Sequence, residues 1–224
     1  MGKMIDVAAF QTAANKAQAI KDAGYGAVAG YYFHASSFKQ QLTASAAQQM
    51  KAAGLYIVSI WESGYPTTPG YFTREQGIAD AQGAIARAAE ATQPFGTPIY
   101  WTYDTDASDD DVQDAMPYAQ AFHDIAKEAG WLASAYGPGA LLKALSEAGI
   151  ICNNGWLSES RSFNGTAAWR SSATIVQLTE ATVLGMDVDT NETNGDAGGW
   201  QPQAAIVDPD QLTHSPAPEP GVGG

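Results

Sequence analysis

The sequence of 224 residues predicts an α/β fold, a single TIM-like barrel with five βα units followed by three strands with little helix between them. Apolar strand patterns alternate five times with Ala-rich helical patterns, which is typical of a parallel sheet. Eight strand patterns in all allow this sheet to close into a barrel. The alternative is an open doubly wound sheet, but no Gly-rich phosphate loop follows the first strand, where that fold carries one.

The first five strand patterns are short apolar runs, and a helical pattern follows each of them. The strands are expected at Met4–Phe10, Gly26–Phe33, Leu55–Trp61, Thr97–Asp106 and Trp131–Tyr136. The helical patterns begin with capping residues or end at glycines. They are expected over Gln11–Ala23, from Thr43 to Ala53, from Thr73 to Ala91, from Asp109 or Asp110 to about Gly130, and after Gly139 to about Ala148.

The last three strands are expected at Gly149–Trp156, Thr174–Thr179 and Leu184–Val188. The few residues between the last two favour a hairpin, because a parallel crossover needs about a dozen residues or more. Residues 1–208 are therefore predicted to form the barrel. Residues 209–224 are rich in Pro and Gly and are expected to form an extended tail.

Composition excludes several classes of function. The formal charge of −13 disfavours nucleic acid and anionic membranes as partners, since both need basic patches. The single cysteine, Cys152, excludes an internal disulfide and is expected to be a small core residue. No signal-peptide core and no run long enough for a membrane-spanning helix is found. A cytoplasmic protein fits this pattern, as does a phage protein released by lysis or built into a virion.

Polar residues on strands, or at their carboxyl ends, are the candidates for a functional site. An acidic pair, Asp104 and Asp106, ends the fourth strand, and the carboxyl end of such a strand is where a β/α barrel places its active site. Because burying charge is costly, acids that converge there favour a site. The candidate catalytic residues are Asp6, Glu62, Asp104, Asp106 and Asp187, with Asp189 beside them, and the candidate binding residues are Tyr32, Tyr103, Tyr136, Trp156 and Gln177.

Each acid also has a plain structural alternative. Asp6 could accept hydrogen bonds from backbone amides, and Glu62 could pair with Arg74. Asp104 and Asp106 could be turn or capping residues, and Asp187 and Asp189 could be turn residues.

The residue types favour glycoside hydrolysis, which commonly needs two carboxyl groups, with aromatic side chains to stack on sugar rings. An acidic metal site is a weaker alternative, because Asp104-x-Asp106 lacks the rest of a calcium loop. The histidines at 34, 123 and 214 have no metal-ligand spacing. Neither a metal nor another cofactor is expected.

Several short motifs occur in a recognisable order between residues 4 and 192. They are Ile5-Asp6, the helix from Leu42-Thr43 to Ala53-Gly54, Leu55–Val58, Glu62, Ile99-Tyr100 before Asp104-x-Asp106, Ala135-Tyr136-Gly137, Trp156, Gln177 and Gly185–Asn191. Their order and spacing resemble the glycoside-hydrolase-like barrel domains related to the family-25 lysozymes, found in secreted bacterial proteins and in phage.

This resemblance implies a barrel, and peptidoglycan or a related polysaccharide as the partner. The related lysozymes have Asp-x-Glu at the fourth strand, with the Glu as proton donor. Here Asp106 stands at that position, and its carboxyl group is about an ångström short, a displacement that can cost about a hundredfold in rate. Three alternatives follow: Asp106 acts on a shifted substrate, Glu62 is the acid, or the barrel binds glycan without cleaving it.

Two functions are therefore predicted. The first is a cell-wall hydrolase, either a phage lysin or a virion-borne part. The second is a weak or inactive glycan-binding barrel of a virion or cell surface, tethered to a partner through its tail. In either case Asp6, Asp104 and Asp106 should crowd one mouth and raise at least one pKa above ~3.9. Asp106, furthest along the strand, is favoured, so Asp106→Asn is expected to stabilise the protein at pH 7.

Overall fold

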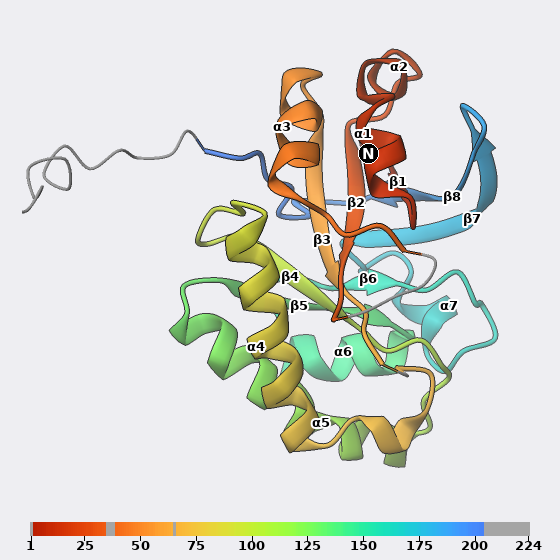
Figure 1. Ribbon diagram of the computed structural model, residues 1–224. Helices are drawn as coiled ribbons and strands as arrows, with labels where there is room; N and C mark the ends of the chain where they lie inside the picture. The colour runs from red at the N-terminus through yellow and green to blue at the C-terminus, as the bar shows by residue number, and fades with distance from the viewer. Residues whose placement is uncertain (1, 35–38, 65, 204–224) are drawn as a thin grey trace, which may run out of the picture.

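In the computed structural model, which describes residues 2–34, 39–64 and 66–203, eight strands form a closed barrel in the order β1 to β8 (Figure 1). Neighbouring strands from β1 to β7 run parallel, and β8 is antiparallel to both β7 and β1. The strands are β1 (Gly2–Asp6), β2 (Ala27–Tyr32), β3 (Tyr56–Trp61), β4 (Pro98–Thr102), β5 (Leu132–Gly137), β6 (Trp156–Leu157), β7 (Ile175–Val183) and β8 (Met186–Thr193).

The helices lie outside the barrel, and those along β1 to β5 complete the five predicted βα units. Of the helices in the described part of the chain, only the short α7 lies on the side formed by β6 to β8. The helices are α1 (Phe10–Ala14), α2 (Ala17–Asp22), α3 (Ala44–Ala52), α4 (Arg74–Glu90), α5 (Asp109–Glu128), α6 (Gly139–Glu147) and α7 (Thr166–Trp169), with a short 3₁₀ helix η1 (Pro69–Tyr71) before α4.

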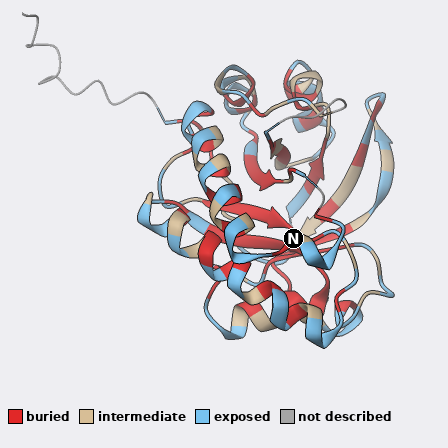
Figure 2. Cartoon of the chain, turned by 60° about the horizontal axis from the view of Figure 1, so that its bottom comes forward, coloured by how far each residue is buried: buried red, intermediate tan, exposed pale blue. Residues whose placement is uncertain are grey.

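Two layers of apolar side chains pack on the two faces of the strands. A small cluster that includes Met4, Val58, Tyr100 and Ile175 fills the inside of the barrel. A larger cluster lies between the strands and the helices, with Ile5, Trp101 and Phe122 among its members. This division follows from the period-2 alternation of side chains in a strand. Figure 2 shows the result, with buried strands and helices that are buried on one face only.

Local chemistry sets the helix starts. The hydroxyl groups of Thr43 and Thr73 accept hydrogen bonds from the third residue of α3 and of α4, as predicted. The start of α5 differs from the prediction, because Ser108 is its N-cap. Ser108 and Asp111 form a reciprocal capping box, which places Asp109 and Asp110 in the first turn of the helix.

Three other expectations need correction. The first strand ends at Asp6, because Phe10 begins α1 and its ring packs against Gly30. The helix predicted over residues 11–23 is two short helices, with non-helical backbone at Lys16, whose amino group donates to the Leu184 carbonyl oxygen at 2.7 Å. The sixth strand holds only two residues. The segment before it is a loop, so Cys152 is exposed and not in the core.

The predicted hairpin of the last two strands is confirmed. Leu184 and Gly185 between β7 and β8 both have positive φ, 54° and 73°, as a tight hairpin turn requires. Only residues 189–193 of β8 pair with β1, whereas its first three residues pair with β7 alone. The end of the hairpin therefore extends past the ring of the barrel. The predicted tail, 209–224, lies outside the described residues.

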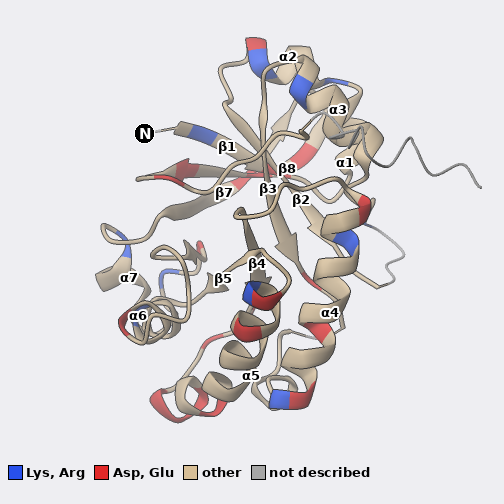
Figure 3. Cartoon of the chain, turned by 90° about the vertical axis from the view of Figure 1, so that its left-hand side faces the viewer, with Lys and Arg blue, Asp and Glu red and all other residues tan. Residues whose placement is uncertain are grey.

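Helices α4 and α5 lie side by side in close contact at Gly77 (Figures 1 and 3). A β-carbon added there would come within 2.5 Å of the Tyr118 carbonyl oxygen, a backbone atom that cannot easily move. We expect Gly77→Ala to lower the free energy of unfolding by about 1–3 kcal/mol, although Ala is the better helix former by about 1 kcal/mol. Urea unfolding measures this. Gly70→Ala in η1, where nothing lies within 4 Å, is the control and should change little. An unchanged midpoint for Gly77→Ala would show that the helices separate at low cost.

Candidate active site

The carboxyl ends of the parallel strands surround a small cavity of about 100 Å³ at the mouth of the barrel. Its lining residues lie on all eight strands or follow a strand end within two residues. They are Asp6, Tyr31, Ile60, Glu62, Thr102, Asp104, Tyr136, Trp156, Gln177 and Asp189. The cavity shares Asp6, Tyr31, Glu62 and Asp189 with a groove of about 630 Å³. This groove continues along the β7–β8 hairpin.

Asp6 forms the floor of the mouth and is 3% exposed. Its two carboxylate oxygens accept hydrogen bonds from the Tyr31 hydroxyl at 2.9 Å and from the Asn191 side-chain amide at 2.8 Å. Asn191 is held in turn by the Trp156 indole, which donates to its side-chain oxygen at 2.9 Å. Burial, followed by the nearby charge of Asp189, raises the pKa of Asp6 to about 7. Asp6 is therefore a buried acid that changes charge near neutral pH. The hydrogen bonds described here come from side chains and not from the backbone amides offered as the structural alternative.

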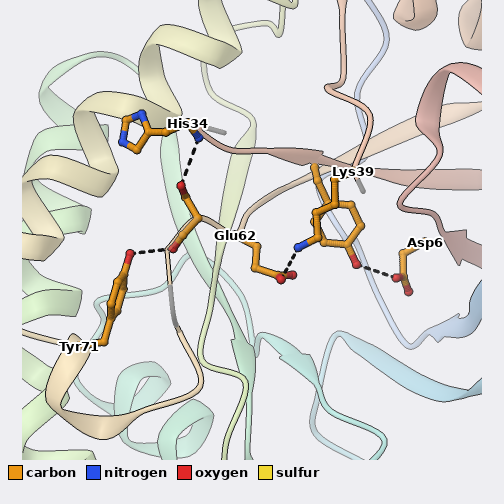
Figure 4. Close-up of polar contacts among 7 residues, drawn as sticks. Asp6, His34, Lys39, Glu62 and Tyr71 are labelled. Carbon is orange, nitrogen blue, oxygen red and sulfur yellow. Dashed lines mark hydrogen bonds and ion pairs between the residues drawn. The ribbon is translucent and has the colours of Figure 1, made fainter. Parts of the chain in front are cut away.

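Glu62 follows β3 and forms an ion pair with Lys39 (Figure 4). The Lys39 amino group also lies 4.5 Å from the centre of the Tyr31 ring, in a cation–π arrangement. The pairing with Arg74 offered by the sequence is thus replaced by one with Lys39. Lys39 lies in a linking segment without periodicity, so no pattern in the sequence indicated that it would reach the site.

The segment after Glu62 is fixed from the other side. The Ser63 hydroxyl accepts a hydrogen bond from the His34 backbone at 3.2 Å, and the Ser63 carbonyl oxygen accepts one from the Tyr71 hydroxyl at 2.8 Å (Figure 4). The Tyr71 hydroxyl oxygen also lies 2.7 Å from Asp80, a buried acid of α4, so its single proton is shared between these two acceptors. These bonds hold the backbone beside Glu62 against the helix layer.

Asp104 and Asp106 point in different directions, contrary to the expectation that they share one space. The alternation of β4 is as predicted up to its end at Thr102, but the chain is no longer extended beyond it. Asp104 lines the cavity at its exposed rim. Partial burial of its carboxyl group, followed by the charge of Glu62, raises its pKa. Asp106 turns away and accepts hydrogen bonds from the backbone amides of Ala107 at 2.9 Å and Asn164 at 2.7 Å.

Asp106 thus ties the loop before α7 to the end of β4. It was favoured as the acid with a raised pKa, whereas the raised values fall on Asp6, Asp104 and Asp189. We expect Asp106→Ala to lower the free energy of unfolding by about 1 kcal/mol, because two backbone amides lose their acceptor. Chemical denaturation measures this. A more stable variant would contradict the structural role given to Asp106 here and support its original assignment to the site.

The other predicted residues divide between the mouth and the outside of the barrel. Tyr136, Trp156 and Gln177 line the cavity. The Tyr136 hydroxyl donates to Gln177 at 2.7 Å, and the Gln177 amide donates to Asp189 at 2.8 Å. Asp187 is exposed and lines the outer groove near the hairpin end, away from the small cavity.

Tyr32 and Tyr103 do not reach the mouth, because both lie on the outward face of their strands. Tyr32 donates to Gln93 at 3.0 Å, and Tyr103 stacks on Phe72 with ring centres 4.1 Å apart. The residue facing inward from β2 is Tyr31, which the sequence analysis missed. The period of two could have found it, because Tyr31 lies on the same face of β2 as Ala29, which pairs with Asp6 of β1.

No group of three or more His, Cys, Asp and Glu side chains in the part of the chain that the structure describes could hold a metal ion. None of the helices found there is long and apolar enough to cross a membrane.

The fold and the acids at its mouth define a glycoside hydrolase-like β/α barrel. Residues 18–193 match the family model described as "Rv2525c-like, glycoside hydrolase-like domain", and the chain belongs to this family. It is 29% identical over 129 residues to the uncharacterized protein FadG of Bacillus subtilis, in an alignment that covers 56% of this chain. That alignment spans only 22% of the length of FadG.

Solved structures share the fold. The Tat-secreted protein Rv2525c of Mycobacterium tuberculosis, solved with L-tartrate, has a TM-score of 0.74 and 20% identity over 89% of this chain and 98% of its own. The autolysin LytC of Streptococcus pneumoniae, solved with a synthetic peptidoglycan ligand, has a TM-score of 0.60 and 15% identity over 85% of this chain and 46% of its own. A family-25 glycosyl hydrolase of Bacillus anthracis has a TM-score of 0.54 and 13% identity over 88% and 90%. The predicted barrel is confirmed, and its fold is similar to that of a family-25 glycosyl hydrolase.

Proposed function

We propose that this chain is a glycan hydrolase that cleaves bacterial cell-wall peptidoglycan at the mouth of the barrel. The observation that carries the proposal is the set of four acids, Asp6, Glu62, Asp104 and Asp189, around one cavity at the carboxyl ends of the strands. Hydrolysis of a glycosidic bond needs a proton donor and a second carboxyl group that acts as base, nucleophile or charge stabiliser. The likeness of the fold to an autolysin solved with a peptidoglycan ligand supports the substrate class.

Asp104 is the proton donor in this proposal. It lies at the exposed rim, where a substrate oxygen can approach, and its raised pKa helps it to keep a proton. Asp106 is turned away from the cavity, and Glu62 lines the cavity but is paired with Lys39, so we give the donor role to neither. Asp6 and Asp189, deeper in the mouth, face the positive charge that develops on the sugar ring in the transition state.

We further propose that the protein belongs to a phage, as a lysin or a virion component. The motif resemblance given above supports this part of the proposal. A second candidate function is glycan binding without cleavage. Two observations favour it: no Glu occupies position 106, and the acid that does is committed to backbone amides of a neighbouring loop. In this case the groove would hold a saccharide, and the acids would provide hydrogen-bond acceptors.

The test measures new reducing ends released from purified peptidoglycan sacculi. Wild type is compared with the double variant Asp6→Asn/Asp104→Asn and with Asp114→Asn, an exposed acid on the outer surface of α5. We expect release by wild type and by Asp114→Asn, and none by the double variant. If wild type sediments with sacculi but releases no reducing ends, the binding function replaces the hydrolase. If it does neither, both candidate functions are wrong.

A further inference from the structure

The groove beside the mouth is rich in carboxylates, since five of its eleven lining residues are acids. Of the described residues that line it, Lys39 alone carries positive charge, and it is already paired with Glu62. Figure 3 shows acidic segments along β7 and β8, the strands that form one wall. The acids of the groove are Asp6, Glu62, Glu180, Asp187 and Asp189, and the adjoining cavity adds Asp104.

Three of these acids crowd one face of the hairpin. Glu180 of β7 lies directly opposite Asp189 of β8 in the antiparallel register, and Asp187 is two residues from Asp189 on the same face. Like charges placed directly opposite in a sheet are destabilising. The pKa of Asp189 is raised by burial and by Glu159 and Glu180, which shows that the local field is negative. A cationic ligand group would relieve this repulsion.

A second, independent feature is a buried hydroxyl group that forms no hydrogen bond with any residue described by the structure. Thr102 is 3% exposed, lines the small cavity from the end of β4, and makes no side-chain hydrogen bond within the described part of the chain. Buried polar groups in proteins are nearly always hydrogen-bonded, so an unpaired hydroxyl beside a cavity is open to a water molecule or a polar group of a ligand. Thr102 faces the same cavity as Asp6 and Asp104.

From these features we infer that the groove selects glycans that carry free amino groups, such as glucosamine units that lack the N-acetyl group. The inference rests on the proposed function and names its substrate class more closely. Each protonated amine would lie against carboxylates of the hairpin, and a sugar hydroxyl or amine would complete the bonding of Thr102. The carboxylates are spread along the groove, which fits a chain of separated cationic groups better than a single metal ion.

The experiment is calorimetric titration with two β-1,4-linked hexamers, one of glucosamine and one of N-acetylglucosamine. We expect the glucosamine hexamer to bind about tenfold more tightly at low salt, the effect of a few partly screened ion pairs. Because salt screens exposed charges, the difference should shrink as the ionic strength rises above about 0.1 M. Equal affinities at low salt would overturn the inference.

Variants separate the two features. Asp187→Asn and Glu180→Gln should each reduce the preference for the glucosamine hexamer by about two- to fivefold, and the control Asp114→Asn should not. Thr102→Val keeps the size of the side chain and removes the hydroxyl. It should weaken binding of the glucosamine hexamer while leaving the melting temperature equal or higher, because the hydroxyl has no partner to lose.

A poly-lysine peptide tests for charge attraction alone. If it displaces the glucosamine hexamer from wild type, and Thr102→Val binds the hexamer as well as wild type does, the groove is not a specific saccharide site and the inference fails. The proposed function fails separately, on the absence of new reducing ends from sacculi. A preference for the amine-bearing hexamer without any cleavage would uphold the inference for a binding module.

Discussion

Replacing Asp104 with Asn should lower the rate of peptidoglycan hydrolysis by about 10²- to 10⁴-fold, the usual contribution of a general acid. The amide has nearly the same shape as the acid but cannot donate a proton with the same ease. Asp104 stands at the exposed rim of the mouth, and burial of its carboxyl group, followed by the charge of Glu62, raises its pKa. The loss should appear in kcat, with KM little changed, because the proton is transferred only in the transition state.

The matched comparison for this prediction is Asp106→Asn, two residues further along the chain. Asp106 faces the loop before α7 and not the cavity, so this variant should keep the rate within a few-fold of wild type when both are assayed as folded protein. The opposite outcome, a lost rate in Asp106→Asn with an intact one in Asp104→Asn, would return the donor role to Asp106. Release of reducing ends under steady-state conditions provides the measurement.

Replacing Asp6 with Asn should stabilise the protein at pH 8 by roughly 3–4 kcal/mol while impairing hydrolysis. The folded-state pKa of Asp6 is about 7, against 3.8 for an ordinary Asp. Below about pH 4 the Asp6 carboxyl group is protonated in both the folded and the unfolded state, so it does not lower the free energy of unfolding. As the pH rises to about 7 the unfolded chain loses the proton first, so the stability of wild type falls. Above pH 7 the cost is constant, and Asn, which cannot ionise, avoids it.

Denaturant titrations of both proteins at a series of pH values test this effect. The difference in unfolding free energy should be near zero at pH 4 and grow until about pH 7. Asp6→Ala is the control, because it also removes the charge but leaves Tyr31 and Asn191 without their acceptor. It should follow the same pH dependence at a lower absolute stability. A difference that does not vary with pH would show that Asp6 stays ionised in the folded protein.

The fold was largely predictable because the signals behind it are local. Period-2 runs, capping threonines and C-terminal glycines located the first five strands and most of the helices. The short link predicted between Thr179 and Leu184 identified the hairpin, although β7 continues through that link to Val183. One error lies where a distant contact decides. The amino group of Lys16, at the break between α1 and α2, binds the Leu184 carbonyl oxygen in the β7–β8 hairpin, 168 positions away. The start of α5 is a local error, because Ser108 and Asp111 cap the helix reciprocally and leave Asp109 inside it.

The site was predictable in part, for the same reason. Strand-end acids such as Asp6 and Asp104 follow from the position of each strand, and both reach the mouth. The direction of the Asp106 side chain could not be predicted in this way, because side chains alternate only within a strand and β4 ends at Thr102. Lys39 could not be found at all, since its loop has no period and its partner Glu62 is 23 positions away. The outward positions of Tyr32 and Tyr103 were available from the alternation itself.

The pairing of β8 with β1 has a consequence for how the protein folds during its synthesis. The hydrogen bond between Asn191 and Asp6 joins residues 185 positions apart. The barrel can therefore close only when β8, the last of the eight strands, is present. On the ribosome β1 emerges first and must wait with one edge open while residues up to 193 are made. Such distant pairing makes folding slow, and the open edge invites aggregation in the meantime. The acid on the floor of the mouth gains its environment only at that final step, so an unfinished nascent chain carries no assembled site.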